Sequence, residues 1–103
     1  YSFCLDTFQW SQIKPLGQVP TPRSAAPIVT SQDGSSLFIL GGYSKQSDDK
    51  GTVHTDVYAL TEDETNWQCR QVKISGAKPE QRCGSSLHCS LNTCVLFGGV
   101  ADY

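Results

Sequence analysis

Short apolar runs separated by turn-forming residues make up most of the chain, and no stretch keeps the apolar spacing of a helix over a useful length. Between Arg23 and Val72, four such runs predict strands, over residues 24–30, 37–40, 52–60 and 66–72. Asp33-Gly34 lies between the first two runs, and Asp-Gly is a strong short signal for a hairpin turn. Run 37–40 is apolar throughout, which is typical of a strand buried on both faces. The pattern therefore predicts an all-β chain.

The same order of residues occurs twice. Trp10 and Trp67 are 57 residues apart, and Gly41-Gly42 and Gly98-Gly99 have the same separation. A repeat of roughly 50 residues is typical of a propeller blade or solenoid unit, which buries its apolar faces by stacking on its neighbours. We therefore expect the end of one unit, a complete four-stranded unit and the start of a third, over residues 1–14, 23–73 and 82–103.

The double glycine that ends an apolar run, the aromatic residue after it, a later Tyr, a Trp after that and the upstream Pro22-Arg23 together resemble the kelch repeat. The resemblance implies a fragment of a β-propeller built from four-stranded antiparallel blades, with one complete blade and two partial blades. The second copy departs from the pattern at Gln81, where Pro is preferred, and at Cys83, where a small polar residue is usual. Structural roles are implied for the repeated positions, which are Trp10, Gly41, Gly42, Tyr58, Trp67, Gly98 and Gly99.

Charge and composition narrow the classes of partner. The net charge is −2 and the basic residues are dispersed, whereas a nucleic-acid binder usually carries a basic stripe. The longest apolar stretch is about four residues, far below the ~20 that span a bilayer. We therefore expect neither nucleic-acid nor membrane partners. Five cysteines, an odd number without a C-x-x-C pair, favour reduced thiols in a cytoplasmic or nuclear protein.

Motifs for catalysis, phosphate binding and metal binding are absent. The double glycines lack the G-x-x-x-x-G-K-S/T and G-x-G-x-x-G patterns of phosphate loops, and no G-x-S-x-G nucleophile elbow occurs. Cys89 and Cys94 are too far apart for the usual zinc spacing, and the adjacent His88 and Cys89 would point to opposite faces of a strand. We expect no catalytic residue, cofactor or metal.

Antiparallel connectivity predicts where binding occurs. If strands alternate in direction, the long connection 43–51 and the linkers 14–22 and 74–81 emerge at one end of the sheet, and the acidic turn 62–64 lies at the other. Long loops on a rigid scaffold are where recognition usually occurs. The partner-binding set expected there is Arg23, Tyr43, Ser44, Lys45, Gln46, Asp48, Asp49, Lys50 and Arg82. A structural role for the two arginines, at the entrance of a strand, remains an alternative.

These observations favour a non-enzymatic scaffold whose partners are another protein and the remaining blades of the same chain. The alternative is a propeller enzyme, similar to galactose oxidase or a sugar mutarotase, whose catalytic residues lie outside this chain.

Overall fold

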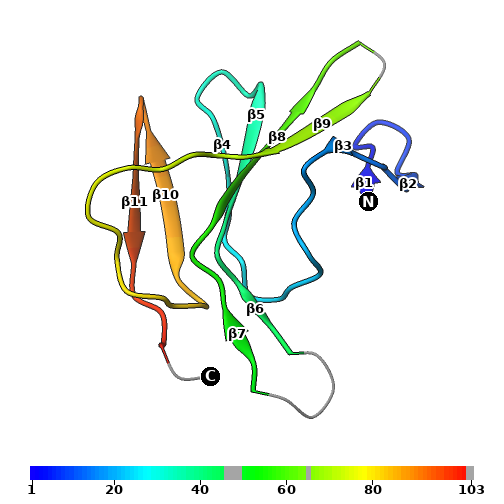
Figure 1. The fold of residues 1–103 in the computed structure, drawn as a ribbon. Coiled ribbons are helices and arrows are strands. Elements are labelled where there is room, and N and C mark those ends of the chain that lie inside the picture. The colour runs from blue at the N-terminus through cyan, green and yellow to red at the C-terminus, as the bar shows by residue number, and fades with distance from the viewer. Residues whose placement is uncertain (46–49, 65, 102–103) are drawn as a thin grey trace.

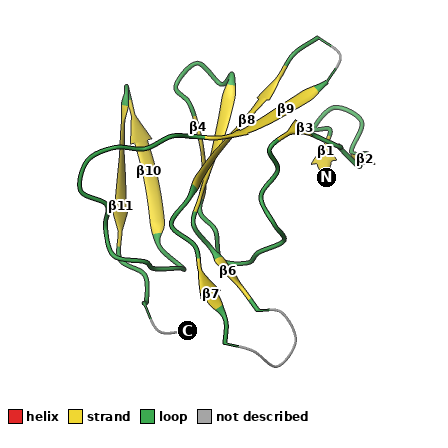
Figure 2. Ribbon diagram, viewed as in Figure 1, coloured by secondary structure: helices red, strands yellow, loops and turns green. Residues whose placement is uncertain are grey.

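The computed structural model describes residues 1–45, 50–64 and 66–101, and its described residues form strands and turns without a helix (Figures 1 and 2). The prediction of an all-β fold is confirmed. The chain forms one main sheet, two flanking hairpins and a short two-stranded ribbon.

The main sheet contains the complete blade. Strands β4 (Ile28–Thr30), β5 (Ser36–Leu40), β8 (Val57–Glu62) and β9 (Trp67–Gln71) pair antiparallel in the spatial order β9-β8-β5-β4. The registers are continuous, with Leu37 opposite Leu60 and Leu60 opposite Cys69. β5 is half-buried along its length, so the expectation of burial on both faces is met only in part.

Two of the predicted strands differ from the observed ones. The first shortens from residues 24–30 to Ile28–Thr30 because Ala25 has a positive φ of 56° and Pro27 has no N–H to donate to a ladder. The run 52–60 divides into two strands. Its first part, β7 (Thr52–Val53), pairs antiparallel with β6 (Tyr43–Ser44) and leaves the main sheet as a ribbon.

A fifth strand, which the apolar pattern does not predict, closes the outer edge of the blade. β3 (Leu16–Gly17) comes from the linker that precedes the blade and pairs parallel with β9, so that Gly17 lies opposite Cys69. Gly17 has a φ of 96°, and a Cβ there would clash with the carbonyl oxygen of Cys69. Glycine is therefore required where the linker meets the sheet.

The two hairpins lie on either side of the complete blade in the chain. β1 (Ser2–Phe3) pairs with β2 (Trp10–Ser11), and β10 (Ser86–Ser90) pairs with β11 (Thr93–Phe97), both antiparallel. The assignment of these hairpins to a preceding and a following blade stays a prediction.

The core lies on the complete blade. Tyr58, Leu60 and Cys69 are buried together, and half-buried apolar side chains pack against them, namely Ile13, Leu37, Ile39 and Trp67. Ile13 shows that the linker contributes to the core of the blade it leads into. At the repeat-equivalent positions of the first hairpin, Phe3 and Trp10 are 40% and 70% exposed because that hairpin has no third strand beside it.

One expectation about the cysteines is wrong. Cys89 and Cys94 lie directly opposite each other in the β10–β11 hairpin and are joined by a disulfide, whereas Cys4, Cys69 and Cys83 are free. The two-residue turn Leu91–Asn92 produces this pairing, which the spacing of the cysteines alone does not reveal.

Candidate partner-binding end of the blade

The blade has two different ends, as the alternating strand directions predict. The connections β4–β5, β8–β9 and β10–β11 lie at one end, which we call the turn end (Figure 1). The ribbon β6–β7 lies at the opposite end, together with the starts of β4 and β10, and we call this the ribbon end. The amide N–H of Gly84 donates to the carbonyl oxygen of Ala25 at 3.2 Å and joins the starts of β4 and β10 there.

The ribbon holds two of the predicted binding residues, Tyr43 and Ser44. In the sequence these two read as part of a loop, but Tyr43 pairs with Val53 and Ser44 with Thr52 as an antiparallel ribbon. The predicted residues Gln46, Asp48 and Asp49 lie outside the described residues. Lys45 and Lys50, which flank that segment, are both exposed.

Side-chain contacts fix the base of the ribbon. Ser44 Oγ and His54 Nε2 are 2.7 Å apart, a hydrogen bond between residues on opposite sides of the ribbon. A Cβ at Gly51 would meet the ring of Tyr43, so the aromatic side chain lies against the residue that precedes β7. Tyr43 and Ser44 are therefore engaged within the ribbon and only half-exposed.

Arg23 is bound within the blade. Its side chain is 6% exposed, and its Nη1 donates to Asp56 Oδ1 at 2.6 Å and to the carbonyl oxygen of Gly41 at 3.0 Å. Its Nε and Nη2 donate to the carbonyl oxygen and Oγ1 of Thr21, each at 3.1 Å. The guanidinium carbon lies 5.6 Å from the centre of the Tyr58 ring. All three nitrogens have acceptors, Nη1 in the blade and Nε and Nη2 on Thr21 of the linker, so we leave Arg23 out of the binding surface proposed below.

Arg82 repeats two of these bonds. Its Nε donates to the carbonyl oxygen of Glu80 at 3.0 Å, as Arg23 does to Thr21, and its Nη1 donates to that of Gly98 at 3.4 Å, as Arg23 does to Gly41. No carboxylate among the described residues bonds to Arg82. Its hydrogen bonds are exposed and its side chain is half-buried, so Arg82 presents more of its charge to solvent than Arg23 does.

The double glycines turn the chain at this end. Gly41 and Gly42 have φ values of 57° and 102°, and a Cβ on Gly41 would come within 2.8 Å of the carbonyl oxygen of His54. Gly98 and Gly99 have φ values of 77° and 94°. These left-handed conformations favour glycine and allow backbone segments to approach closely where the ribbon leaves the sheet.

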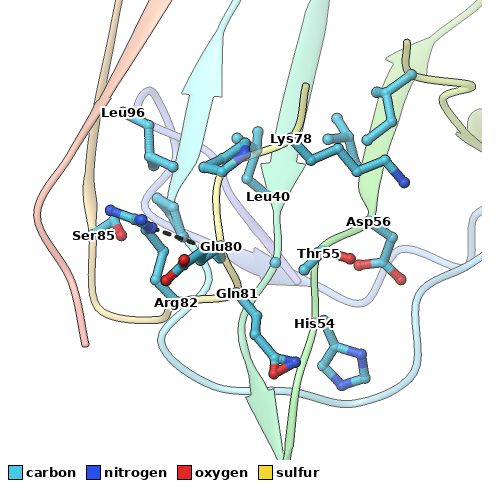
Figure 3. Close-up of a pocket in the computed structure, with 15 residues that line it drawn as sticks. Leu40, His54, Thr55, Asp56, Lys78, Glu80, Gln81, Arg82, Ser85 and Leu96 are labelled. Carbon is cyan, nitrogen blue, oxygen red and sulfur yellow. Dashed lines mark hydrogen bonds between the residues drawn. The ribbon is translucent and has the colours of Figure 1, made fainter. Parts of the chain in front are cut away.

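A cavity of about 110 Å³ separates the complete blade from the linker that leads into β10 (Figure 3). Apolar atoms of Pro27, Leu40, Val57 and Leu96 line it together with the linker residues Ile74 and Pro79. Figure 3 shows Lys78, Glu80 and Gln81 of the linker near the end of β5, with His54 on one side and Arg82 on the other. The ribbon end therefore combines a projecting ribbon with an apolar crevice bordered by charged side chains.

The turn end consists of short, internally bonded turns. The Asp33 carboxylate accepts hydrogen bonds from the amide of Ser35 at 3.0 Å and from the hydroxyls of Ser31 and Ser35, each at 2.7 Å. These bonds, led by the one from the Ser35 amide, lower the pKa of Asp33 to about 2. Asp63 accepts the amide of Asn66 in the next turn at 2.7 Å. Asp33 and Asp63 therefore stabilise the turns that they belong to.

Residues 1–45, 50–64 and 66–101 hold no group of three or more His, Cys, Asp or Glu side chains that could bind a metal ion. Over the same ranges, no helix is long and apolar enough to cross a membrane.

Asp56, Thr21 and His54 are site residues that the partner-binding prediction does not include. Asp56 gives no signal beyond its place just before an apolar run, and its pairing with Arg23 joins residues 33 positions apart. The sequence signal that could have revealed such residues is the repetition of Arg23 and Arg82. An arginine at the same place in each repeat needs hydrogen-bond acceptors at matching places.

Comparison with known proteins shows what the sequence of this chain is similar to. A family model described as the KLHDC2/KLHL20/DRC7 Kelch-repeats domain matches residues 1–103. Among curated proteins, Tip elongation aberrant protein 1 of Schizosaccharomyces pombe is 29% identical to this chain over 100 residues, which are 96% of this chain and 8% of that protein. The chain therefore spans only a small part of the length of that relative.

Proposed function

We propose that this chain, which belongs to the kelch-repeat family whose model spans it, is part of a non-enzymatic scaffold whose protein partner binds the ribbon end. Kelch repeats generally mediate protein–protein interaction. The proposal adds to that general role a particular end of the blade and particular residues.

One observation carries the proposal. The longest connection of the complete blade leaves the sheet as a ribbon, beside the crevice formed by the next linker, whereas the opposite end has only short turns. The ribbon is anchored by the Ser44–His54 bond and by the Arg23–Asp56 pair beneath it. A projecting element on a rigid base loses less conformational entropy when a partner binds than a free loop does.

The exposed charges define the surface that we propose. Lys45 and Lys50, which flank the ribbon, and Arg82 of the next repeat supply positive groups, whereas the predicted residues Gln46, Asp48 and Asp49 lie outside the described residues. Tyr43 and Ser44 support the ribbon from within. The acidic residues Glu62 and Glu64 lie at the far end of the sheet.

The experiment compares matched charge reversals at the two ends in the full-length protein that contains this chain. The ribbon variant is Lys45→Glu with Lys50→Glu, and the control is Glu62→Lys with Glu64→Lys, all four positions being exposed. Affinity capture from the source cells with quantitative mass spectrometry should show proteins retained by the wild type and the control and reduced roughly fivefold or more by the ribbon variant.

Thermal unfolding of each variant checks that the fold is retained. Equal capture by the ribbon variant and the wild type would reject the proposal. Loss of the same proteins only in the control variant would place the binding surface at the turn end.

Two narrower points are also proposals. Pro22-Arg23-Ser24, residues 41–46 and 49–52, His54 and Asp56 resemble kelch domain-containing protein 4. This resemblance supports a cytoplasmic or nuclear location. Microscopy of the tagged full-length protein tests the location, and a secreted protein would contradict it.

A further inference from the structure

The hairpin β10–β11 brings two cysteines together at a particular register. Ser90 and Thr93 form the pair next to the two-residue turn, and Cys89 and Cys94 form the next pair. In a hairpin with a two-residue turn, the pair beside the turn is hydrogen-bonded and the following pair is not. Opposite side chains are closest at such a non-hydrogen-bonded pair, so the backbone register alone places the two thiols within reach of each other.

The pair is accessible. Cys94 is exposed and Cys89 is half-buried, and both line a groove of about 630 Å³. The other wall of this groove is the β4–β5 turn of the complete blade, from Ser31 to Asp33, together with Phe38. A small solute can therefore reach both sulfur atoms from the turn end. Cys69 and Cys83, by contrast, are 4% and 0% exposed.

The hairpin accommodates both the thiol and the disulfide states. A bond between residues five positions apart closes a short loop, so it restricts the unfolded chain less than a long-range disulfide does. The register is already set by five residue pairs and a two-residue turn, so the strands keep their alignment without the bond. Exposed disulfides that contribute little to the stability of the fold are the ones that exchange readily with small thiols.

We propose that Cys89 and Cys94 form a reversible dithiol–disulfide pair that is oxidised by small-molecule disulfides, such as oxidised glutathione, entering the groove at the turn end. The Cys94 thiolate attacks one sulfur of oxidised glutathione, forms a mixed disulfide and releases one glutathione thiolate. The Cys89 thiolate then attacks Cys94 Sγ and displaces the second glutathione thiolate. The cysteines lose two electrons and two protons, and oxidised glutathione is reduced to two thiols.

Oxidation has a structural consequence. The bond joins the end of β10 to the start of β11 one pair from the turn, so it limits local opening of the pairs beside it although the register does not depend on it. The pair thus links the opening of this hairpin to the thiol–disulfide balance around it.

The test uses the full-length protein in glutathione buffers with a stepwise increase in the ratio of oxidised to reduced glutathione. Each sample is quenched in acid and alkylated, and the labelled cysteines are located by peptide fragmentation. Cys89 and Cys94 should lose label together, without accumulating a glutathione adduct, and should regain it when excess reduced glutathione is added. Cys4, which is exposed and free, is the internal reference and should show only labelled or glutathione-bound forms.

A variant separates pairing from simple thiol reactivity. In Cys89→Ser the second displacement is impossible, so Cys94 should retain the glutathione adduct over the ratios at which the wild type closes its disulfide. Independent titration of the two cysteines, a disulfide that persists in excess reduced glutathione, or full labelling at every ratio would each overturn the proposal.

Amide hydrogen exchange tests the effect of the disulfide on the hairpin. Exchange of the amides next to Cys89 and Cys94 should be slower in the oxidised state, whereas exchange of residues 57–62 in β8 should be unchanged. Equal exchange of these amides in the two states would overturn the claim that the bond limits local opening.

Discussion

Replacing Arg23 with methionine should destabilise the blade far more than replacing an exposed arginine does. Methionine retains much of the apolar stem but removes the donors to Asp56, Gly41 and Thr21. The bond to the carbonyl oxygen of Gly41 contributes about 1 kcal/mol. Asp56 is 21% exposed, and leaving its carboxylate without a cation should cost about 1–2 kcal/mol, below the range for a fully buried pair. The expected loss is therefore about 2–3 kcal/mol.

The assay is denaturant unfolding of the full-length protein, followed by a probe that reports on this blade, such as the fluorescence of Trp67. Arg70→Met is the matched control, because Arg70 is exposed on β9 and such a change should stay within about 0.5 kcal/mol. A double-mutant cycle of Arg23→Met with Asp56→Asn should show a coupling energy of about 1 kcal/mol or more. A loss for Arg23→Met equal to that of Arg70→Met would refute a structural role for Arg23.

Three further predictions follow from local geometry. Gly17→Ala should detach β3 and accelerate hydrogen exchange of the Gln18 amide, which donates to the carbonyl oxygen of Cys69 at 2.9 Å. The control Gly76→Ala, with a similar φ of 86° and no atom near its Cβ, should cost only backbone strain of about 1 kcal/mol. Unchanged exchange at Gln18 would contradict the strand pairing. The carboxyl carbon of Asp33 should titrate with a pKa of about 2 by NMR, and Ser31→Ala should raise this pKa. Because the folded pKa lies below the usual value near 3.9, this carboxylate stabilises the fold at pH values above about 3.9. The contribution disappears as the pH falls through about 2. The hydroxyl of Thr7 is the main cause of the lowered pKa of the Cys4 thiol, and burial raises the pKa of the Cys69 thiol. Alkylation at neutral pH should therefore be faster at Cys4 than at Cys69, and Thr7→Ala should slow it at Cys4. Equal alkylation rates at the two cysteines would contradict both environments.

The parts of the fold that the sequence predicts are those determined by local pattern. The apolar run 37–40 and the alternating run 66–72 become β5 and β9 because their side chains match a half-buried sheet. The two ends of the blade follow from antiparallel connectivity, and the assignment of the ribbon, Arg23 and Arg82 to one binding surface stays a prediction.

The parts that it does not predict depend on contacts between distant segments. β3 is two residues of a proline-containing linker, and it is a strand only because β9 offers an open edge to Leu16 and Gly17. The run 52–60 divides because Gly41 and Gly42 turn the chain and bond to the backbone of Asp56 and His54. The disulfide follows from the register of a hairpin and not from the spacing of the cysteines.

The placement of the partner is tested most directly by hydrogen exchange of the full-length protein with and without a captured partner. Binding at the ribbon end predicts protection of residues 43–53 and 78–84, with residues 31–35 and 62–66 at the turn end unchanged. Protection confined to the turn end, with the ribbon exchanging as in the free protein, would contradict it.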